Sequence, residues 1–289
     1  MPSVVIAAHN EESVLGSCLD ALLVQGLRSD EIVVVANGCS DRTADVARAR
    51  NVVVIDLEQA GKASALNAGD VVASGYPRIY LDADIVVPPG GVASVISTFE
   101  KFPLALAVVP RRRVNTAGRT WPVRGYYTVS TRLPAFREGL FGRGMIALSA
   151  EGRGRFTDFP TMLADDLFID AQFSDAEKFV ASGVEVVVDV PFTTRDLLRR
   201  LVRVRRGNAQ MRAAGAAGEM EAAVRPAQRW AWLRATAGHP TLWGSAVTYV
   251  ILTTIAGRRA CRRGDGADAW GHDTSTRESA NPAPGATAL

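Results

Sequence analysis

The chain contains little lysine. Only Lys62, Lys101 and Lys178 are lysines, so the basic charge comes mainly from arginine, and the formal net charge is only +3. A protein that binds nucleic acid typically carries a strongly basic surface in which lysine and arginine cluster. We therefore expect no nucleic-acid partner.

Cysteine is also scarce, and its spacing excludes two classes of protein. Cys18, Cys39 and Cys261 are far apart, and no Cys-x-x-Cys pair is present. Neither a disulfide framework nor a zinc site is indicated, and a reducing compartment is expected. Residues 1–8 lack a basic segment followed by a long apolar one, so no signal peptide is expected. These observations favour a cytoplasmic location, at the inner face of the membrane if the C-terminal region contacts lipid.

What the chain does contain is enough apolar sequence for an ordinary core. Its 289 residues are 47% hydrophobic and 22% charged, as in a globular protein with one large or two small domains. Apolar runs alternate with segments of helical periodicity. Strands are expected at residues 3–8, 32–35, 52–55, 79–88, 105–109 and 184–190, and helices at 14–23, 42–50, from 61, at 92–102 and at 195–211. This alternation predicts an α/β fold with a mainly parallel central sheet and helices on both faces.

The apolar run that contains Asp82 and Asp84 is the most informative stretch. If residues 79–88 are extended, alternation places both carboxylates on the same side of the chain. Two such oxygen ligands suit Mg²⁺ or Mn²⁺, which keeps water or phosphate oxygens as its other ligands. Taken alone, however, an Asp-x-Asp pair is more often a solvated acidic turn at the end of a strand.

The neighbouring segments favour the metal site over the solvated turn. Polar clusters at residues 9–12, 37–41 and 82–84 each follow a predicted strand. Ligands of parallel α/β sheets bind at the carboxyl ends of the strands. We therefore expect the three clusters to open into one cleft.

A second carboxylate pair, Asp165 and Asp166, precedes another helical apolar pattern. Either residue could simply cap that helix, a position where Asp is common. Residues 111–155 are rich in Gly and Arg and weakly periodic apart from an apolar stretch at 145–148, so we expect loops over the cleft, where an acceptor enters. The arginines of residues 195–212 are by default a solvated basic face.

The C-terminal region contains an uncharged stretch at residues 235–257. Three interpretations stay open: a membrane span, an interfacial helix that makes a peripheral membrane contact, or a helix packed within the protein. Its short apolar core disfavours the span, which needs about 20 mainly apolar residues. Residues 264–289 are polar and contain Gly and Pro, so a disordered tail is expected.

Five blocks of sequence, in their order and spacing, resemble the family 2 inverting glycosyltransferases, nucleotide-diphosphosugar enzymes of the GT-A fold. The resemblance covers about residues 3–210. Its blocks are residues 7–12 (AAHNEE), 37–43 (NGCSDRT), 61–69 (GKASALNAG), 82–84 (DAD) and 165–166 (DD). It implies a glycosyltransferase domain at 1–215, with a nucleotide-binding half at about 1–110 and an acceptor half at about 111–215. A C-terminal helical region at 216–263 would follow.

The resemblance also implies a role for individual residues. Asp84, with Asp82, would hold a divalent cation, Mg or Mn, and Asp166 would be the catalytic base, assisted by Asp165. Contacts to a donor of the UDP, GDP or dTDP type are implied for Ala8, Asn10, Glu11, Asn37, Asp41, Lys62, Asn67, Asp82, Arg203 and Arg206. The expected reaction is metal-dependent transfer of a hexosyl-type group to an acceptor hydroxyl with inversion.

Two departures from the family pattern concern the nucleotide and the type of transfer. Many relatives have Asp where this chain has Ala36, so the resemblance does not identify the nucleotide base of the donor. Processive members carry Gln-x-x-Arg-Trp after the catalytic pair, whereas residues 203–207 read RVRRG without Trp. We therefore expect single transfer rather than polymerisation.

Other classes fit less well. Phosphatases that use Asp-x-Asp need it on the first strand, and a P-loop NTPase needs a glycine upstream of Gly61-Lys62 that this chain lacks. A sugar-nucleotide-binding or scaffold protein without catalysis is the remaining alternative. Intact Asp82, Asp84 and Asp166 argue against it.

Overall fold

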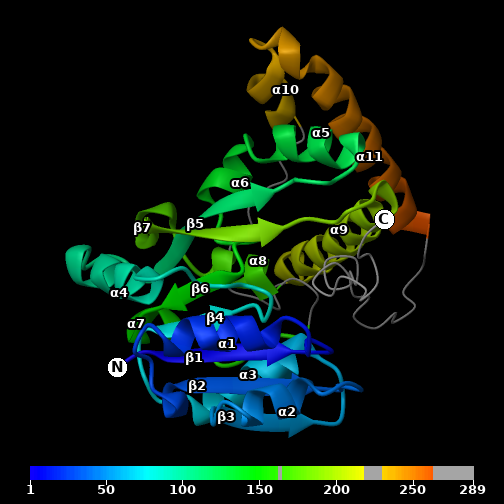
Figure 1. Ribbon diagram of the computed structural model, residues 1–289. Helices are drawn as coiled ribbons and strands as arrows, with labels where there is room; N and C mark the ends of the chain where they lie inside the picture. The colour runs from blue at the N-terminus through cyan, green and yellow to red at the C-terminus, as the bar shows by residue number, and fades with distance from the viewer. Residues whose placement is uncertain (162–164, 218–229, 263–289) are drawn as a thin grey trace, which may run out of the picture.

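The computed structural model describes residues 1–161, 165–217 and 230–262 (Figure 1). Seven strands form one sheet in the order β3-β2-β1-β4-β6-β5-β7. The strands are β1 (Ser3–Ala8), β2 (Ile32–Asn37), β3 (Val53–Leu57), β4 (Arg78–Leu81), β5 (Ala107–Asn115), β6 (Met145–Leu148) and β7 (Lys178–Asp189). The β6 strand is antiparallel to both neighbours, while every other pairing is parallel. The predicted mainly parallel sheet is confirmed.

Helices cover both faces of the sheet because the central strands are apolar on both sides. In β1, Val4 and Ile6 pack toward one set of helices, and Val5 packs toward the other. The first set is α1 (Leu15–Leu23), α2 (Thr43–Arg48) and α4 (Gly91–Lys101), and the second is α3 (Lys62–Val72), α8 (Asp165–Ala171) and the end of α9 (Thr194–Ala216). The carboxyl ends of β1, β2 and β4 therefore lie between two helical layers.

The strand that precedes Asp82 is shorter than we expected. It ends at Leu81, and residues 82–84 form a turn in which the Ile85 amide donates to the Asp82 carbonyl at 3.1 Å. Alternation along an extended chain is therefore the wrong reason for placing Asp82 and Asp84 together. The apolar residues Ile85 and Val87, which suggested a longer strand, are buried in the core beyond the turn.

The expectation of loops at residues 111–155 is also wrong. The segment begins with the last half of β5 and includes α5 (Trp121–Ser130), α6 (Pro134–Glu138), β6 and α7 (Ala150–Arg153). Helix α5 has weak intrinsic propensity because it contains Gly125 and several β-branched or aromatic residues. Packing stabilises it instead, since the Tyr126 ring stacks on Tyr249 with centroids 5.3 Å apart.

The C-terminal helices α10 (Ala231–Thr236) and α11 (Trp243–Arg262) lie at the end of the molecule away from β3 (Figure 1). One face of α11 packs on α5 and α9 through Leu252 and Ala256. Its other face exposes Trp243, Val247 and Ile251. Within the described ranges, no helix is long and apolar enough to cross a membrane. The tail predicted at 264–289 lies outside the described residues.

The predicted domain boundaries are not tested by this architecture. The single sheet continues across residue 110, where β5 joins the two predicted halves. Helix α9 ends at Ala216, close to the predicted end of the transferase domain.

Candidate active site

The turns that follow β1 and β2 are joined by a fully buried amide. The Asn37 side chain donates to the Ala8 carbonyl at 2.7 Å and accepts from the Gly61 amide at 3.0 Å. It therefore holds together the ends of two strands and the start of α3. Asn37 and Ala8 were both expected to contact the donor, and the structure places them at the centre of the strand ends.

Asn10 and Asp41 connect the same two turns at the surface. The Asn10 carboxamide oxygen accepts from the Ser40 amide at 2.8 Å, and the Asp41 carboxylate accepts from the Glu12 amide at 3.1 Å. Asn10 has a left-handed φ of 53°, which turns the chain toward β2. Glu11 is buried beside them. The sequence clusters at 9–12 and 37–41 are thus in direct contact, while their donor contacts stay predictions.

Lys62 links the two carboxylate motifs. Its Nζ atom lies 3.1 Å from Asp82 Oδ1 and 2.8 Å from Asp165 Oδ2, so the end of β4 and the start of α8 share one cation. Burial alone would lower the pKa of this ammonium, but the negative charges of Asp165, Asp82 and Asp166 outweigh it and raise the pKa well above its ordinary value. These four side chains line one pocket between the sheet and α8.

Asp166 is the most perturbed carboxylate of this pocket. Burial, followed by the negative charges of Asp165 and Asp82, raises the pKa of Asp166 to about 7, against the opposing charge of Lys62. Its Oδ2 atom accepts from the Gly142 amide at 3.0 Å. A carboxylate of this kind suits proton transfer, because a general base works best with a pKa near the operating pH.

The glycine pair Gly142 and Gly144 positions both carboxylate motifs, and sequence reasoning missed it. The Gly142 amide binds Asp166, and the Gly144 carbonyl accepts from the Asp82 amide at 2.8 Å. Both glycines are left-handed, with φ of 65° and 69°, and a Cβ on Gly144 would lie 2.4 Å from Ile85 Cγ1. The signal was present as Gly-Arg-Gly directly before the apolar stretch at 145–148.

Asp82 and Asp84 fit a divalent cation as a partial ligand set. The Asp82 side chain is 42% exposed and lines the pocket, and Asp84, two residues further along the same turn, is also exposed. The ammonium of Lys62 against Asp82 shows that this position favours a cation. Among the described residues, no group of three or more His, Cys, Asp or Glu side chains is arranged to hold a metal. The donor set therefore suits Mg²⁺ or Mn²⁺ that completes its shell with water and phosphate oxygens.

Asn67, Arg203 and Arg206 were also predicted to contact the donor. The Asn67 amide exchanges two hydrogen bonds with the backbone of Phe159, at 3.1 and 2.7 Å, so a side-chain contact with the donor would break them. These bonds anchor the segment that leads to Asp165. Arg203 and Arg206 are half-buried on α9, and their predicted contact with the diphosphate is not tested.

The comparisons with known proteins establish the family. Residues 3–150, just over half of the chain, match the family Glycosyl transferase family 2, and the chain belongs to this family of glycosyltransferases. A segment of 118 residues is 32% identical to the poly-beta-1,6-N-acetyl-D-glucosamine synthase of Staphylococcus epidermidis, covering 39% of this chain and 29% of that protein. The same enzyme of Staphylococcus aureus (strain COL) is 30% identical over 116 residues, which cover 38% and 28%. The match spans less than a third of either synthase.

Solved structures show the same fold. The mannosyltransferase PcManGT from Pyrobaculum calidifontis, in complex with GDP-Man and Mn²⁺, has a TM-score of 0.59 at 20% identity over 90% of this chain and 77% of that chain. TarS of S. aureus has a TM-score of 0.50 at 16% identity over 70% and 38%. At such identities the likeness concerns the fold alone. The predicted GT-A fold is confirmed.

Proposed function

We propose that this protein transfers a glycosyl group from a nucleotide-diphosphosugar to an acceptor hydroxyl, in a single, metal-dependent step with inversion. One observation carries the proposal. Asp166, whose pKa is raised to about 7, lies in one pocket with Asp82 and is tied to it through Lys62 and Asp165. A base poised near neutral pH beside a cation-binding carboxylate is the pairing that such a transfer requires.

The acceptor side of the reaction is assigned to Asp166. The acceptor oxygen attacks the anomeric carbon from the face opposite the diphosphate, the bond between that carbon and the phosphate oxygen breaks, and the hydroxyl proton passes to Asp166. The Gly142 amide fixes one carboxylate oxygen at 3.0 Å, which leaves the other for the proton. Asp165 keeps Lys62 in place and supports the basicity of Asp166 by like-charge proximity.

The leaving-group side is assigned to Asp84, Asp82 and Lys62. A bound Mg²⁺ or Mn²⁺ would stabilise the negative charge that develops on the nucleoside diphosphate. Asp84 and Asp82 would hold that cation. Lys62 Nζ, which lies 3.1 Å from Asp82, would turn toward the phosphate oxygens when the donor binds. The mannosyltransferase neighbour was solved with GDP-Man and Mn²⁺, which supports a donor and a cation of these classes.

The choice of nucleotide stays open among UDP, GDP and dTDP, because Ala36 at the end of β2 offers no side-chain hydrogen bond to a base or ribose. A scaffold or binding role without catalysis is the alternative. The raised pKa of Asp166 favours catalysis, because a half-buried carboxylate with too little positive charge around it destabilises the fold and has no use in a scaffold.

A thermal-shift experiment tests the donor and the cation together. UDP, GDP and dTDP are each added with and without Mn²⁺ to the wild type, to Asp84→Asn and to the control Asp30→Asn, which removes an exposed carboxylate at the opposite end of β2. A nucleotide at 100 times its dissociation constant should stabilise the wild type and the control by about 2.7 kcal/mol, only with Mn²⁺. Asp84→Asn should lose this shift. If no nucleotide stabilises the wild type, the proposal is wrong.

We also propose that α11 contacts a membrane surface, which would place the protein at the inner face of the membrane. Trp243, Val247 and Ile251 recur every four residues along its outer face and are 58%, 58% and 51% exposed. The basic residues Arg259 and Arg262 follow in the last turn, as in helices that lie on anionic lipid. Cosedimentation with anionic vesicles should fall for Val247→Ser and Ile251→Ser together. Unchanged sedimentation would exclude this contact.

A further inference from the structure

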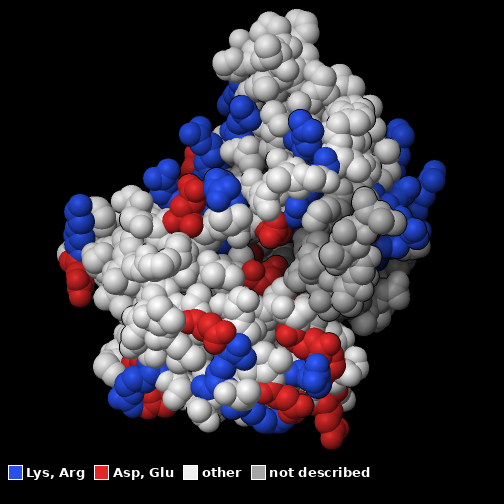
Figure 2. Space-filling model, viewed as in Figure 1, with Lys and Arg blue, Asp and Glu red and all other residues white. Residues whose placement is uncertain are grey.

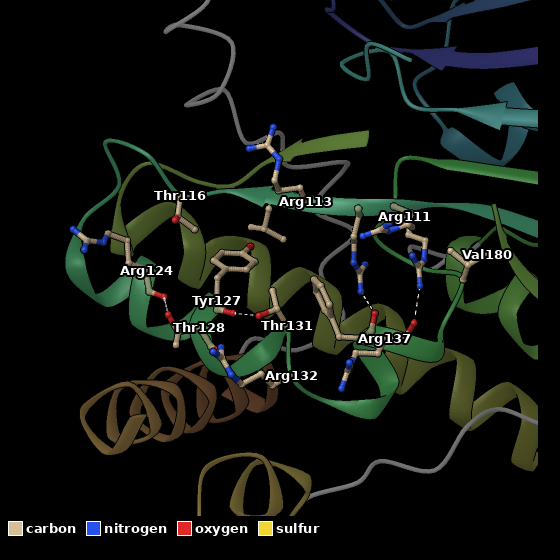
Figure 3. Close-up of a pocket in the computed structure, with 14 residues that line it drawn as sticks. Arg111, Arg113, Thr116, Arg124, Tyr127, Thr128, Thr131, Arg132, Arg137 and Val180 are labelled. Atoms are coloured by element: carbon tan, nitrogen blue, oxygen red, sulfur yellow. Dashed lines mark hydrogen bonds between the residues drawn. The ribbon is translucent and has the colours of Figure 1, made fainter. Parts of the chain in front are cut away.

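A cavity of about 650 Å³ opens on the predicted acceptor half of the protein (Figure 3). Its lining comes from β5, α5, α6, the segment that follows α6 and Val180 of β7, and includes seven arginines. No described Asp or Glu lines it. Such a concentration of one sign of charge in a concave site raises the local concentration of anions.

Two of these arginines, Arg112 and Arg143, are held rigidly in the wall of the cavity. Arg143 is only 4% exposed, and its three nitrogens donate to the carbonyls of Gly139, Pro110 and Arg137 at 2.7–3.1 Å. Arg112 donates to the carbonyls of Phe141 and Gly142 at 2.7 and 2.8 Å, and its guanidinium lies over the Phe136 ring. Carbonyl oxygens orient these cations without neutralising them.

No carboxylate of the described chain lies within ion-pair distance of Arg112 or Arg143. Burial first, and then the positive charge of Arg143, lower the pKa of Arg112 to about 9 against the opposing charge of Asp166. Burial also lowers the pKa of Arg143. A buried charge without a counter-charge is costly, and an anion bound beside it would remove that cost.

Exposed arginines complete the site. Arg124 on α5, Arg132 after it and Arg137 on α6 stand at the rim, and none is within ion-pair distance of a described carboxylate. Arg111 and Arg113 share the one carboxylate of Glu185, at 3.9 and 3.2 Å. The rim cations can therefore turn toward a ligand at little cost.

The cavity is adjacent to the proposed base and separate from the nucleotide turns. Arg112 donates to the Gly142 carbonyl, and the amide of the same Gly142 donates to Asp166 at 3.0 Å. One glycine thus separates the two sites. The turns expected to hold the donor belong to the other half of the chain, between β1 and α3.

We propose that this cavity is an acceptor subsite that binds a phosphate group on the acceptor, which would direct the acceptor hydroxyl toward Asp166. The assignment rests on the proposed glycosyl transfer. Phosphate is favoured over a single carboxylate because it carries up to two negative charges and several acceptor oxygens, which match the forked donors of several guanidinium groups.

Isothermal titration with inorganic phosphate at constant ionic strength tests the subsite. The variants are Arg124→Gln/Arg137→Gln, which changes only exposed rim residues, and the control Arg28→Gln, an exposed arginine that precedes β2 and does not line the cavity. Phosphate should bind the wild type and the control, and at least about tenfold more weakly the double variant, because each lost guanidinium removes charge-assisted hydrogen bonds to the phosphate oxygens. No binding to the wild type, or equal binding to the double variant, overturns the proposal.

Two further titrations identify where the phosphate comes from. A soluble sugar phosphate is compared with vesicles of phosphatidylcholine that contain phosphatidic acid, with phosphatidylcholine alone as reference. Binding of the sugar phosphate that is lost in the double variant supports a soluble acceptor. Binding to phosphatidic acid vesicles that is lost in the same variant supports a lipid phosphate. Vesicle binding that ignores the two arginines and depends only on Val247 and Ile251 reports the contact of α11 with lipid. If sugar phosphate binding is also unchanged in the double variant, the subsite is overturned.

The Asp84→Asn variant separates this proposal from the function on which it rests. It should lose the Mn²⁺-dependent nucleotide shift and keep phosphate binding, whereas Arg124→Gln/Arg137→Gln should show the reverse. If wild-type protein binds phosphate but no nucleotide, the glycosyl transfer is wrong and the anion site stands. If it binds nucleotide but no phosphate, only the acceptor subsite is wrong.

Discussion

The two sides of the segment from Gly142 to Gly144 carry opposite charge. On one side Lys62 lies within ion-pair distance of Asp82 and Asp165, and Asp166 lines the same pocket. On the other side seven arginines line the cavity, and Glu185 is the only described carboxylate paired with any of them. Acidic side chains lie in the hollow at the centre of the face shown in Figure 2, with basic side chains above them.

On each side, charges of one sign outnumber the opposite charges nearby. This favours the neutral form of Asp166 on the acidic side and of Arg112 on the basic side. The pKa of Asp166 is raised by burial and the nearby negative charges, and that of Arg112 is lowered by burial and the charge of Arg143. The buried Asp70 shows the contrast, because Arg78, Arg153 and the Tyr80 hydroxyl all bind it. Protein groups therefore balance the charge of Asp70, whereas we expect ligands to balance the excess charge on these two sides.

The largest effect expected is the loss of activity when the charge of Asp166 on the acidic side is removed. Asp166→Asn keeps the shape but cannot accept the proton, so we expect kcat to fall by about 10²–10⁴ while nucleotide binding is retained. Steady-state kinetics and the thermal shift measure the two quantities. Asp30→Asn serves as the control, and near wild-type turnover by Asp166→Asn would eliminate it as the base.

Replacing Gly144 should destabilise the segment that separates the two sides. The left-handed φ of 69° and the 2.4 Å approach of a new Cβ to Ile85 predict that Gly144→Ala lowers the free energy of unfolding by about 1–3 kcal/mol. Denaturant titration measures it. The control is Gly238→Ala, where a Cβ meets nothing within 4 Å and φ is not left-handed. Equal stability of both variants would show that the segment is not constrained.

On the acidic side, the raised pKa of Asp166 should make the reaction rate depend on pH near neutrality. The base acts in its deprotonated form, and its pKa is raised to about 7, so kcat/KM should fall about tenfold per unit as pH drops below that value. The inflection should move to lower pH at saturating Mn²⁺, because the cation offsets the negative charge of Asp82. A rate that is constant from about pH 5 to 8 would contradict the raised pKa.

The smallest effect is expected on the basic side. Arg137→Gln removes one exposed charge from a cluster of like charges, so the free energy of unfolding should change by less than about 0.5 kcal/mol. Thermal unfolding in low and high salt measures it. A loss of more than about 1 kcal/mol would show that the arginines of this cavity stabilise the fold rather than await a ligand.

Much of the nucleotide half could be predicted because its signals are local. The almost uniformly apolar sequences of β1 and β2 predict burial on both faces, and helical spacing in residues 14–23 predicts α1. The acceptor half gave weaker signals. Helix α5 depends on Tyr249, more than 100 residues away, and no local pattern contains that contact.

The sequence alone determined the class of the fold, the family and the residue types of the site, because strand periodicity and the order of the five blocks are properties of the chain itself. Only the tertiary structure decided which of those residues meet. Lys62 lies between Asp82 and Asp165, which are 83 residues apart, and Gly142 joins Asp166 to Arg112. The pKa of Asp166 and the charge of the arginine cavity follow from burial and from neighbours in space, which the sequence order does not contain.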